Sequence, residues 1–185
     1  GKYPDIIDKL APDVKPDIAE GDMAIICQPI DYLGINYYTR TVYQSDGNGW
    51  FEIVPPATTE LTAMGWEITP DAFTELLVDL HQRYDLPPIY ITENGAAVDD
   101  QVINGAVEDE QRCRYYQNHL SSVDQAIRKG VDIRGYFAWS LLDNFEWSEG
   151  YKMRFGIVYV DYKTQKRTPK RSALWFKEFL NARQQ

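Results

Sequence analysis

The chain has 185 residues, a length typical of one domain or of a substantial part of a larger one. Apolar residues make up 44% and charged residues 25%, which excludes disordered, collagen-like and coiled-coil proteins. With 19 Lys and Arg against 28 Asp and Glu, the net charge of −9 repels phosphate groups, so neither nucleic acid nor a membrane surface is expected as a partner. Aromatic residues reach 14%, which indicates a large core or a surface that stacks on a planar ligand.

Cysteine usage, hydropathy and the first residues give three further expectations. Cys27 and Cys113 occur without CxxC or His-rich spacing, so neither a disulfide framework nor a metal site is predicted, and a cytoplasmic location fits. No apolar run approaches the roughly 18 residues that indicate a membrane-spanning helix. The chain starts at Gly1 rather than Met, inside residues that read as a helix or loop, so we expect other residues to precede it.

Three short apolar runs, rich in aromatic residues, predict β-strands at residues 30–38, 88–92 and 133–139. The runs are uninterrupted rather than alternating, which is expected where both faces of a strand are covered. Helical spacing follows each strand and predicts helices that start near residues 69, 108 and 168. Strands and helices that alternate in this way are typical of parallel βα units.

Each predicted helix carries an apolar stripe that should face the core. The first begins at Thr69-Pro70, an N-cap followed by proline, and the second ends at Gly130 after two basic residues. The expected stripes are Phe73, Leu76, Leu77, Leu80 and Tyr84, then Cys113, Tyr116, Leu120, Val123 and Ile127, then Leu174, Trp175 and Phe179. His81 and His119 fall within these helices and are expected at surface or capping positions.

Long loops follow the C-terminal ends of the strands, over residues 39–67, 93–107 and 140–168. Sites of α/β proteins are built at this end of the sheet. Residues 46–49 (DGNG) predict a tight turn within the first loop. Because an open three-stranded sheet leaves two bare edges and three strands cannot close a barrel, the chain is expected to be part of a larger α/β domain.

A carboxylate stands where the second apolar run stops, in the sequence Ile91-Thr92-Glu93-Asn94-Gly95. Backbone pairing would fix Glu93 there, and its apolar neighbours would limit hydration, as a catalytic carboxylate requires. A structural role as the cap of the Asn-Gly turn is the simpler explanation of this pentapeptide taken alone, because short motifs have little specificity. The pentapeptide alone therefore leaves both interpretations open.

The third strand leads into residues 139–147 (WSLLDNFEW), which combine two indoles, an amide and two acids. A sugar presents apolar C–H faces for stacking and a rim of hydroxyls for carboxylates, and Trp beside Glu suits both. Core packing is the alternative, and it fits Trp139 better than Trp147. A metal site at Asp143 and Glu146 is disfavoured because no His lies nearby in the sequence.

Four motifs in order resemble glycoside hydrolase family 1, the β-glucosidase family: LGINYYT at 33–39, YITENG at 90–95, WSLLDNFEW at 139–147 and RFGIVYVDY at 154–162. The likeness continues to residues 170–176, which are similar to the family's closing helix. It implies an α/β fold, the eight-stranded (β/α)8 or TIM barrel. Residues 1–185 would be the C-terminal part of that single catalytic domain, with strands six to eight and no second domain.

The resemblance also implies roles for individual residues. Glu93 is similar to the nucleophile of a retaining mechanism, and Tyr38 to the tyrosine that positions it and favours its ionised form. The implied substrate-binding residues are Trp139 as the sugar platform, Glu146 as acceptor for O4 and O6, Trp147 as donor to O3, Phe155 near O6, Asn36 near the acid/base and Trp66 as the aglycone-side wall.

One expected element is missing, because the family's general acid/base lies in an Asn-Glu-Pro motif and none occurs in this chain. A retaining enzyme needs that second carboxyl about 5–5.5 Å from the nucleophile. The resemblance therefore implies a cofactor-free β-glucosidase for cellobiose and aryl or alkyl β-glucosides, inactive until the N-terminal part of the same enzyme completes it. Homo-oligomerisation is left open. Two alternatives remain: a phospho-β-glucosidase, disfavoured by Glu149 with only Lys152 as a nearby cation, and a non-catalytic carbohydrate-binding fragment.

Overall fold

The computed structural model describes residues 1–10, 12–14, 16–58 and 60–183 and contains two compact units, Gly1–Asp31 and Tyr32–Gln185. The first unit contains the helices α1 (Ile6–Leu10) and α2 (Asp22–Ile26) and the 3-10 helix η1 (Pro12–Val14). Neither α1 nor α2 has a buried residue. Every residue discussed below as part of the site belongs to the second unit.

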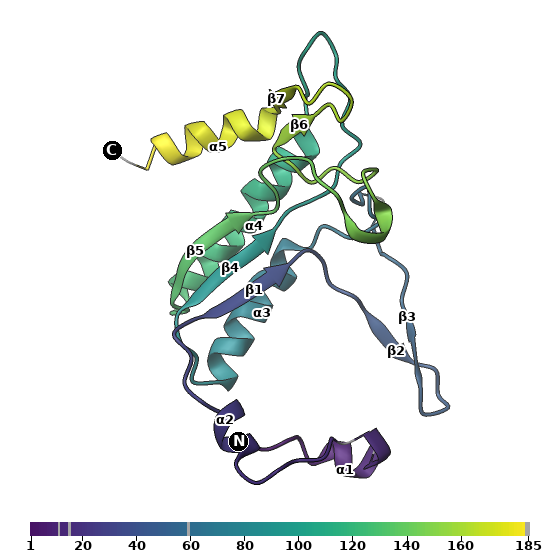
Figure 1. The fold of residues 1–185 in the computed structure, drawn as a ribbon, viewed down its shortest axis with the longest axis vertical. Helices are drawn as coiled ribbons and strands as arrows, with labels where there is room; N and C mark the ends of the chain where they lie inside the picture. Colours follow the sequence, from purple (N-terminus) through teal and green to yellow (C-terminus); the bar gives the residue numbers. More distant parts are fainter. Residues whose placement is uncertain (11, 15, 59, 184–185) are drawn as a thin grey trace. The chain divides into compact units, whose positions relative to one another are not determined.

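The second unit is built on a parallel sheet of three strands, β1 (Leu33–Tyr37), β4 (Ile89–Asn94) and β5 (Ile133–Ala138), in the order β1-β4-β5 (Figure 1). All three strands were predicted, although β1 begins later than expected. β4 extends two residues beyond its predicted run and includes Glu93. The proposed nucleophile is therefore held by the sheet itself.

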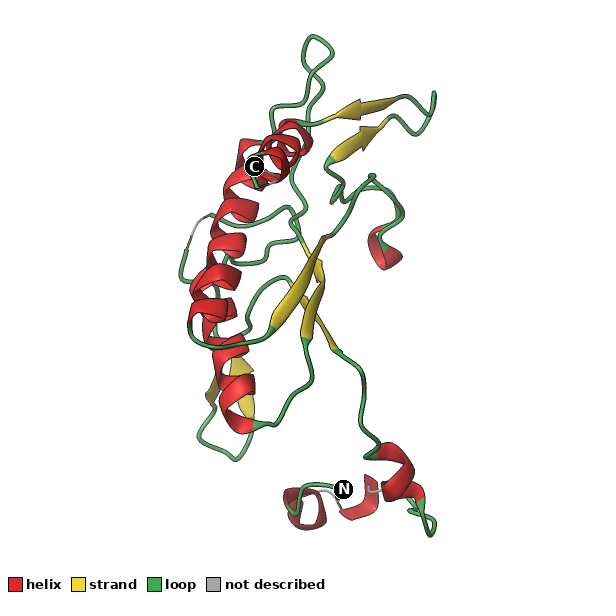
Figure 2. Ribbon diagram, turned by 90° about the vertical axis from the view of Figure 1, so that its left-hand side faces the viewer, coloured by secondary structure: helices red, strands yellow, loops and turns green. Residues whose placement is uncertain are grey.

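Two long helices, α3 (Pro70–Arg83) and α4 (Glu110–Arg128), lie along one face of this sheet (Figure 2). The core between sheet and helices consists of Tyr37, Phe73, Leu77, Ile89, Ile91, Val123, Ala126 and Val131. On the opposite face, Phe137 is 57% exposed. The prediction that both faces of the strands are covered is therefore not fulfilled by the described residues.

The predicted helix stripes are correct in part. Leu76 and Tyr84 of the first stripe and Ile127 of the second are exposed, while the other members of these two stripes are buried or half-buried. The prediction for His119 is wrong, because its ring is fully buried and stacks on Tyr115 at 3.8 Å between centroids. Apolar periodicity overlooks such positions, since a polar side chain can be buried wherever the fold supplies packing and partners.

The predicted start of the last helix is wrong. Thr168 and Pro169 belong to β7 (Arg167–Pro169), which pairs antiparallel with β6 (Val158–Val160). The helix α5 (Arg171–Asn181) begins two residues after Pro169. Leu174 is exposed, whereas Trp175 and Phe179 are half-buried and stack on each other. A proline that starts a helix and a proline that ends a strand look alike in sequence.

The first long loop forms a hairpin of β2 (Tyr43–Ser45) and β3 (Phe51–Ile53) around the predicted turn at residues 46–49. Gly47 and Gly49 have φ of 78° and 88°, a left-handed conformation that favours glycine. The loop after β5 contains a 3-10 helix, η2 (Trp147–Glu149). Among the described residues, no helix has both the length and the apolarity to cross a membrane.

Candidate active site

The site is centred on Tyr38 and Glu93, at the C-terminal ends of neighbouring strands. The Tyr38 hydroxyl donates a hydrogen bond of 2.6 Å to Oε2 of Glu93. Burial, followed by this bond and the negative charges of Glu93 and Glu146, raises the pKa of Tyr38. The phenol therefore remains a protonated donor to the carboxylate.

Two aromatic side chains from distant loops stand beside this pair. Trp66 and Phe155 lie 5.7 and 5.9 Å from the Tyr38 ring, and 6.2 Å from each other, between ring centroids. Two hydrogen bonds between Trp66 and Thr62 close the tight turn that carries Trp66. The backbone N–H of Thr62 donates to the Trp66 carbonyl, and the backbone N–H of Trp66 donates to the Thr62 hydroxyl. Both aromatic residues were predicted from the sequence as site residues, and the fold brings both beside Tyr38.

Asn36 lies directly across from Glu93 in the β1–β4 pairing. Its Oδ1 accepts a hydrogen bond of 2.7 Å from the Thr92 hydroxyl, which fixes the plane of the exposed amide. The Asn36 NH2 group is then the side of the amide that is directed away from Thr92. The prediction that Asn36 lies near the acid/base stays a prediction, because the Asn-Glu-Pro motif that carries this group in the family does not occur in the chain.

Trp139 follows β5 and is half-buried, joined to Ser140 by a cis peptide bond. Its backbone N–H donates to the Asn94 carbonyl at 2.8 Å, and its own carbonyl accepts from the Tyr116 hydroxyl at 3.2 Å. A Cβ atom on Gly95 would lie 1.7 Å from the Trp139 carbonyl oxygen. Only glycine allows this approach, so Gly95 lets the backbone at Trp139 pack against the residues that follow β4.

Glu146 and Trp147 lie on the loop after β5. The backbone N–H of Glu146 donates to the Gly150 carbonyl at 2.6 Å, which closes a tight turn around η2. The Glu146 side chain is half-buried, and its negative charge contributes to the raised pKa of Tyr38. Trp147 is 81% exposed, which removes core packing within the described chain as its explanation.

This loop is attached to the fold through Asp143, which is 4% exposed. Its carboxylate accepts from Lys170 Nζ at 2.8 Å and Arg154 Nη1 at 2.6 Å, and from the backbone N–H groups of Gly156 and Val160. Both oxygens are therefore engaged by protein donors. The pairing of Asp143 with Glu146, considered in the sequence as a weak metal site, is replaced by this set of ion pairs.

Asp143 belongs to a larger buried group, called here the ionic cluster, which consists of Asp100, Asp109, Asp143, Arg112, Arg154 and Lys170. Arg112 binds both oxygens of Asp100, at 3.0 and 2.9 Å, and also pairs with Asp109. Lys170 Nζ bridges Asp100, at 2.5 Å, and Asp143. Three cations thus balance three anions, and all of them except the partly exposed Arg154 are buried.

Burial and partners act in opposite directions on the cations. Burial and the nearby Arg112 charge lower the pKa of Lys170, against the opposing effect of Asp100 and Asp143. Burial also acts to lower the pKa of Arg112, but its bonds with Asp100 and Asp109 outweigh it and the pKa is raised. The cluster connects the loop after β4, the start of α4, the loop after β5 and the start of α5.

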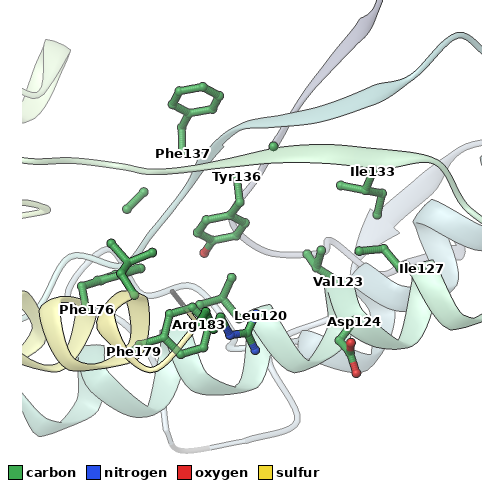
Figure 3. Close-up of a pocket in the computed structure, with 13 residues that line it drawn as sticks. Leu120, Val123, Asp124, Ile127, Ile133, Tyr136, Phe137, Phe176, Phe179 and Arg183 are labelled. Atoms are coloured by element: carbon green, nitrogen blue, oxygen red, sulfur yellow. The ribbon is translucent and has the colours of Figure 1, made fainter. Parts of the chain in front are cut away.

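An apolar groove lies elsewhere, between β5, α4 and α5, and has a volume of about 560 Å³ (Figure 3). Its walls include Ile133 and Tyr136 of β5, Val123 of α4, and Phe176 and Phe179 of α5. None of the predicted site residues lines it. The candidate site is therefore identified by its polar geometry rather than by the size of a groove.

Comparison with known proteins gives a consistent family. The family model described as glycosyl hydrolase family 1 matches residues 1–185. A β-glucosidase of Agrobacterium sp. is 46% identical over 181 residues, covering 95% of this chain and 39% of the relative. A bifunctional β-D-glucosidase/β-D-fucosidase of Bifidobacterium breve is 40% identical, covering 97% and 44%.

A solved structure of the family 1 β-glucosidase from Thermotoga maritima superposes with a TM-score of 0.91 at 43% identity, covering 98% of this chain and 41% of that one. The chain belongs to glycosyl hydrolase family 1. It has the fold of the C-terminal portion of that family's (β/α)8 barrel, as the resemblance implied. The chain spans about two fifths of the length of these relatives.

Proposed function

We propose that the chain is the C-terminal part of a single catalytic barrel domain of a retaining β-glucosidase. The substrates are terminal, non-reducing β-D-glucosyl residues of cellobiose and of aryl or alkyl β-glucosides. The observation that carries this proposal is the 2.6 Å hydrogen bond between Tyr38 and Glu93 at the C-terminal ends of β1 and β4. Family membership and the names of the relatives support the same reaction.

In the proposed reaction, a carboxylate oxygen of Glu93 attacks the anomeric carbon and the bond to the aglycone oxygen breaks. A second carboxylic acid protonates the departing oxygen, and the same group then activates the water that hydrolyses the glycosyl ester of Glu93. Tyr38 holds the attacking carboxylate by its hydroxyl donor. The chemistry requires no cofactor, because two carboxyl groups supply both the nucleophile and the proton.

The remaining site residues bind the sugar. Trp139 forms the stacking platform, Glu146 accepts from the O4 and O6 hydroxyls, and Trp147 donates its indole N–H to O3. Phe155 and Trp66 form walls of the pocket, and Asn36 lies near the acid/base. The contacts of Trp66 and Phe155 with Tyr38 support their assignment to the same pocket.

The acid/base comes from the N-terminal part of the same enzyme, which is also the proposed partner of this chain. Within the described residues, β1 and β5 each pair on one side only, and the groove beside β5 is apolar. Both features support closure by further βα units. The free thiols of Cys27 and Cys113 support a reducing, cytoplasmic location.

A neutral sugar is preferred over a sugar 6-phosphate. The segment after Glu146 carries Glu149, which would repel a phosphate. The nearest cation in the sequence is Lys152, and the next, Arg154, is paired with Asp143. A non-catalytic sugar-binding role is the alternative from another class. It differs from the enzyme in requiring no second carboxyl, so it is tested by the same experiment.

The experiment uses the complete protein in which this chain occurs, incubated with a slowly turned-over 2-fluoro glucoside and then digested and mass-analysed. We expect the label on Glu93. The fluorine slows hydrolysis of the glycosyl-enzyme ester, so the ester accumulates and can be detected. Residues 1–185 alone should not hydrolyse an aryl β-glucoside. A label on Glu146 would overturn the assignment, and full activity of the isolated chain would overturn the need for an acid from elsewhere.

The matched variant is Glu93→Gln, in which the amide cannot act as an anionic nucleophile, and kcat should fall by several orders of magnitude. Glu52→Gln, on the exposed strand β3, serves as the control and should keep the kcat of the unaltered protein. Binding of glucose without any turnover in the unaltered complete protein would favour the sugar-binding alternative.

A further inference from the structure

The pairing of β1 with β4 is irregular at the catalytic pair. Ile35 lies across from Ile91, but the next residue, Asn36, lies across from Glu93. Thr92 is therefore an extra residue on β4, a bulge of the kind that redirects side chains next to active sites. Regular backbone pairing is interrupted where Glu93 must be held most accurately, so side chains must supply the alignment.

Asn94, the residue after Glu93, supplies part of this alignment. Its amide is fully buried and its Nδ2 donates to the Tyr37 carbonyl of β1 at 2.7 Å. Its Oδ1 accepts from the Tyr136 hydroxyl of β5 at 2.5 Å. Figure 3 shows Tyr136 pointing from β5 toward α4, on the side opposite to Phe137. One amide thus connects all three strands at the level of the site.

A single hydroxyl on α4 completes the connection. Tyr115 accepts a hydrogen bond of 3.0 Å from Nδ2 of Asn94 and donates one of 3.2 Å to the backbone carbonyl of Tyr38. It therefore joins the neighbour of Glu93 to the backbone of the residue that donates to Glu93. No other hydrogen bond of the described chain links these two segments through a helix side chain.

The Tyr115 ring is itself held rigidly. It is 1% exposed, stacks on His119 and meets Tyr116 edge to face at 5.8 Å. Burial, as the largest cause, raises the pKa of Tyr115 well above its ordinary value, so the hydroxyl keeps the proton that it donates to Tyr38. A fixed ring with a fixed proton can set a distance between two strands.

We propose that Tyr115 is a positioning residue for the Tyr38–Glu93 pair: its hydroxyl aligns the two strand ends across the bulge so that the phenol of Tyr38 meets the attacking carboxylate. The inference rests on the proposed function, since it concerns the nucleophile of that reaction. Tyr115 acts through Tyr38 and does not contact the sugar.

The test measures how fast a 2-fluoro glucoside labels Glu93 in the complete protein, as a function of reagent concentration. This separates the dissociation constant of the reagent from the first-order rate constant of the chemical step. Tyr115→Phe, which removes only the hydroxyl, should lower the rate constant about tenfold and leave the dissociation constant unchanged, as expected for lost alignment. A purely structural role would lower thermal stability only.

Tyr37→Phe is the matched control. Tyr37 is similarly buried and precedes Tyr38, but its hydroxyl bonds to Thr69 at the start of α3. It should lose a comparable amount of stability and label at the unaltered rate. Tyr136→Phe, which removes a different bond to Asn94, is the second variant if Tyr115→Phe fails to fold, and its rate constant should also fall.

A double-mutant cycle identifies the route of the effect. If Tyr115 acts through the Tyr38 phenol, Tyr115→Phe should change labelling little in a Tyr38→Phe background. Labelling of Glu93 at the unaltered rate in Tyr115→Phe and Tyr136→Phe would overturn the inference while leaving the proposed function intact. Absence of any labelling in the unaltered complete protein would overturn both.

Discussion

Two networks support the candidate site, and they differ in charge. Behind Glu93, the bonds run through the uncharged groups of Asn94, Tyr115 and Tyr136. Beneath the loop that carries Glu146, they run through the six charged groups of the ionic cluster. Both networks consist mainly of buried groups, and each has one partly exposed member, Tyr136 or Arg154, so solvent access does not explain the choice between neutral and charged partners.

The difference reflects what each network must leave undisturbed. A full charge a few ångströms from Glu93 would alter the energy of its ionised form, because buried charges interact strongly at short distance. Amide and phenol groups fix geometry without adding a net charge. The loop network has no such restriction, and its equal numbers of cations and anions leave no net charge.

Charge also determines how much of the chain each network holds together. Asp109 precedes α4, yet its carboxylate accepts from the backbone N–H of Ser172 at 2.8 Å, at the start of α5. Arg112 of α4 additionally donates to the Arg154 carbonyl at 2.7 Å. Removing one charge should therefore loosen several segments, whereas removing one neutral hydroxyl should shift only the catalytic pair.

The largest expected effect on stability is that of Lys170→Met. It leaves Asp100 and Asp143 buried with one cation fewer, and breaking such a pair costs about 3–5 kcal/mol. The free energy of unfolding, measured in urea on the complete protein, should fall by that amount. Lys166→Met, at an exposed turn, is the control and should change it little.

A second substitution sharpens this prediction. Adding Asp143→Asn to Lys170→Met removes one of the unbalanced charges, so the double variant should lose less than the sum of the two single losses. Strictly additive losses would show that the cluster does not act as a coupled unit. The charged network would then differ from the neutral one in composition but not in how its members affect the free energy of unfolding.

Glu146→Ala should have a smaller effect, and on substrate preference rather than folding. A hydrogen bond to a charged group contributes about 1.5–3 kcal/mol, so kcat/KM for an aryl glucoside should fall tenfold or more. Analogues that lack the O4 and O6 hydroxyls should lose much less. Glu149→Ala, three residues away, is the matched control, and equal losses for all substrates would show that Glu146 is structural.

Much of the site could be predicted because it lies where strands end. Glu93 follows one apolar run, and residues 139–147 (WSLLDNFEW) follow another, so both were identifiable from their position in the sequence. Their roles, however, came from the family resemblance, since each pattern alone allowed a structural explanation. The parallel order of the three strands followed from the alternation of strands and helices.

The supporting networks could not be predicted, because their members are far apart in sequence and break the apolar pattern. Lys170 and Asp100 are 70 residues apart, and a lysine ahead of a helix suggests an exposed position. Tyr115 shares the buried face of α4 with Arg112, a residue that periodicity assigns to solvent. Only the packing of α4 against the strand ends shows which polar groups meet.

The smallest expected effect concerns acid and the neutral network. His119 stacks on Tyr115 and its Nδ1 lies 2.8 Å from the Tyr115 carbonyl, while Nε2 is buried without a hydrogen-bond partner within the described chain. Burial lowers the pKa of His119 to about 4 from the model-peptide value of 6.5. Protonation would therefore introduce the positive charge that this network otherwise lacks.

The sign of the pH dependence follows from that difference. The unfolded chain binds the proton at a higher pH than the folded one, so the contribution of neutral His119 is complete above pH 6.5 and is lost as the pH falls toward 4. Between pH 7.5 and 5.5 the free energy of unfolding should decrease by about 1 kcal/mol through this group. His119→Phe, which keeps an aromatic ring and removes the unpaired nitrogen, should lose this share of the pH dependence, whereas His81→Gln at the exposed end of α3 should retain it. Urea midpoints at the two pH values measure the difference, and identical pH dependence in His119→Phe and the unaltered protein would show that the neutral network tolerates the charge.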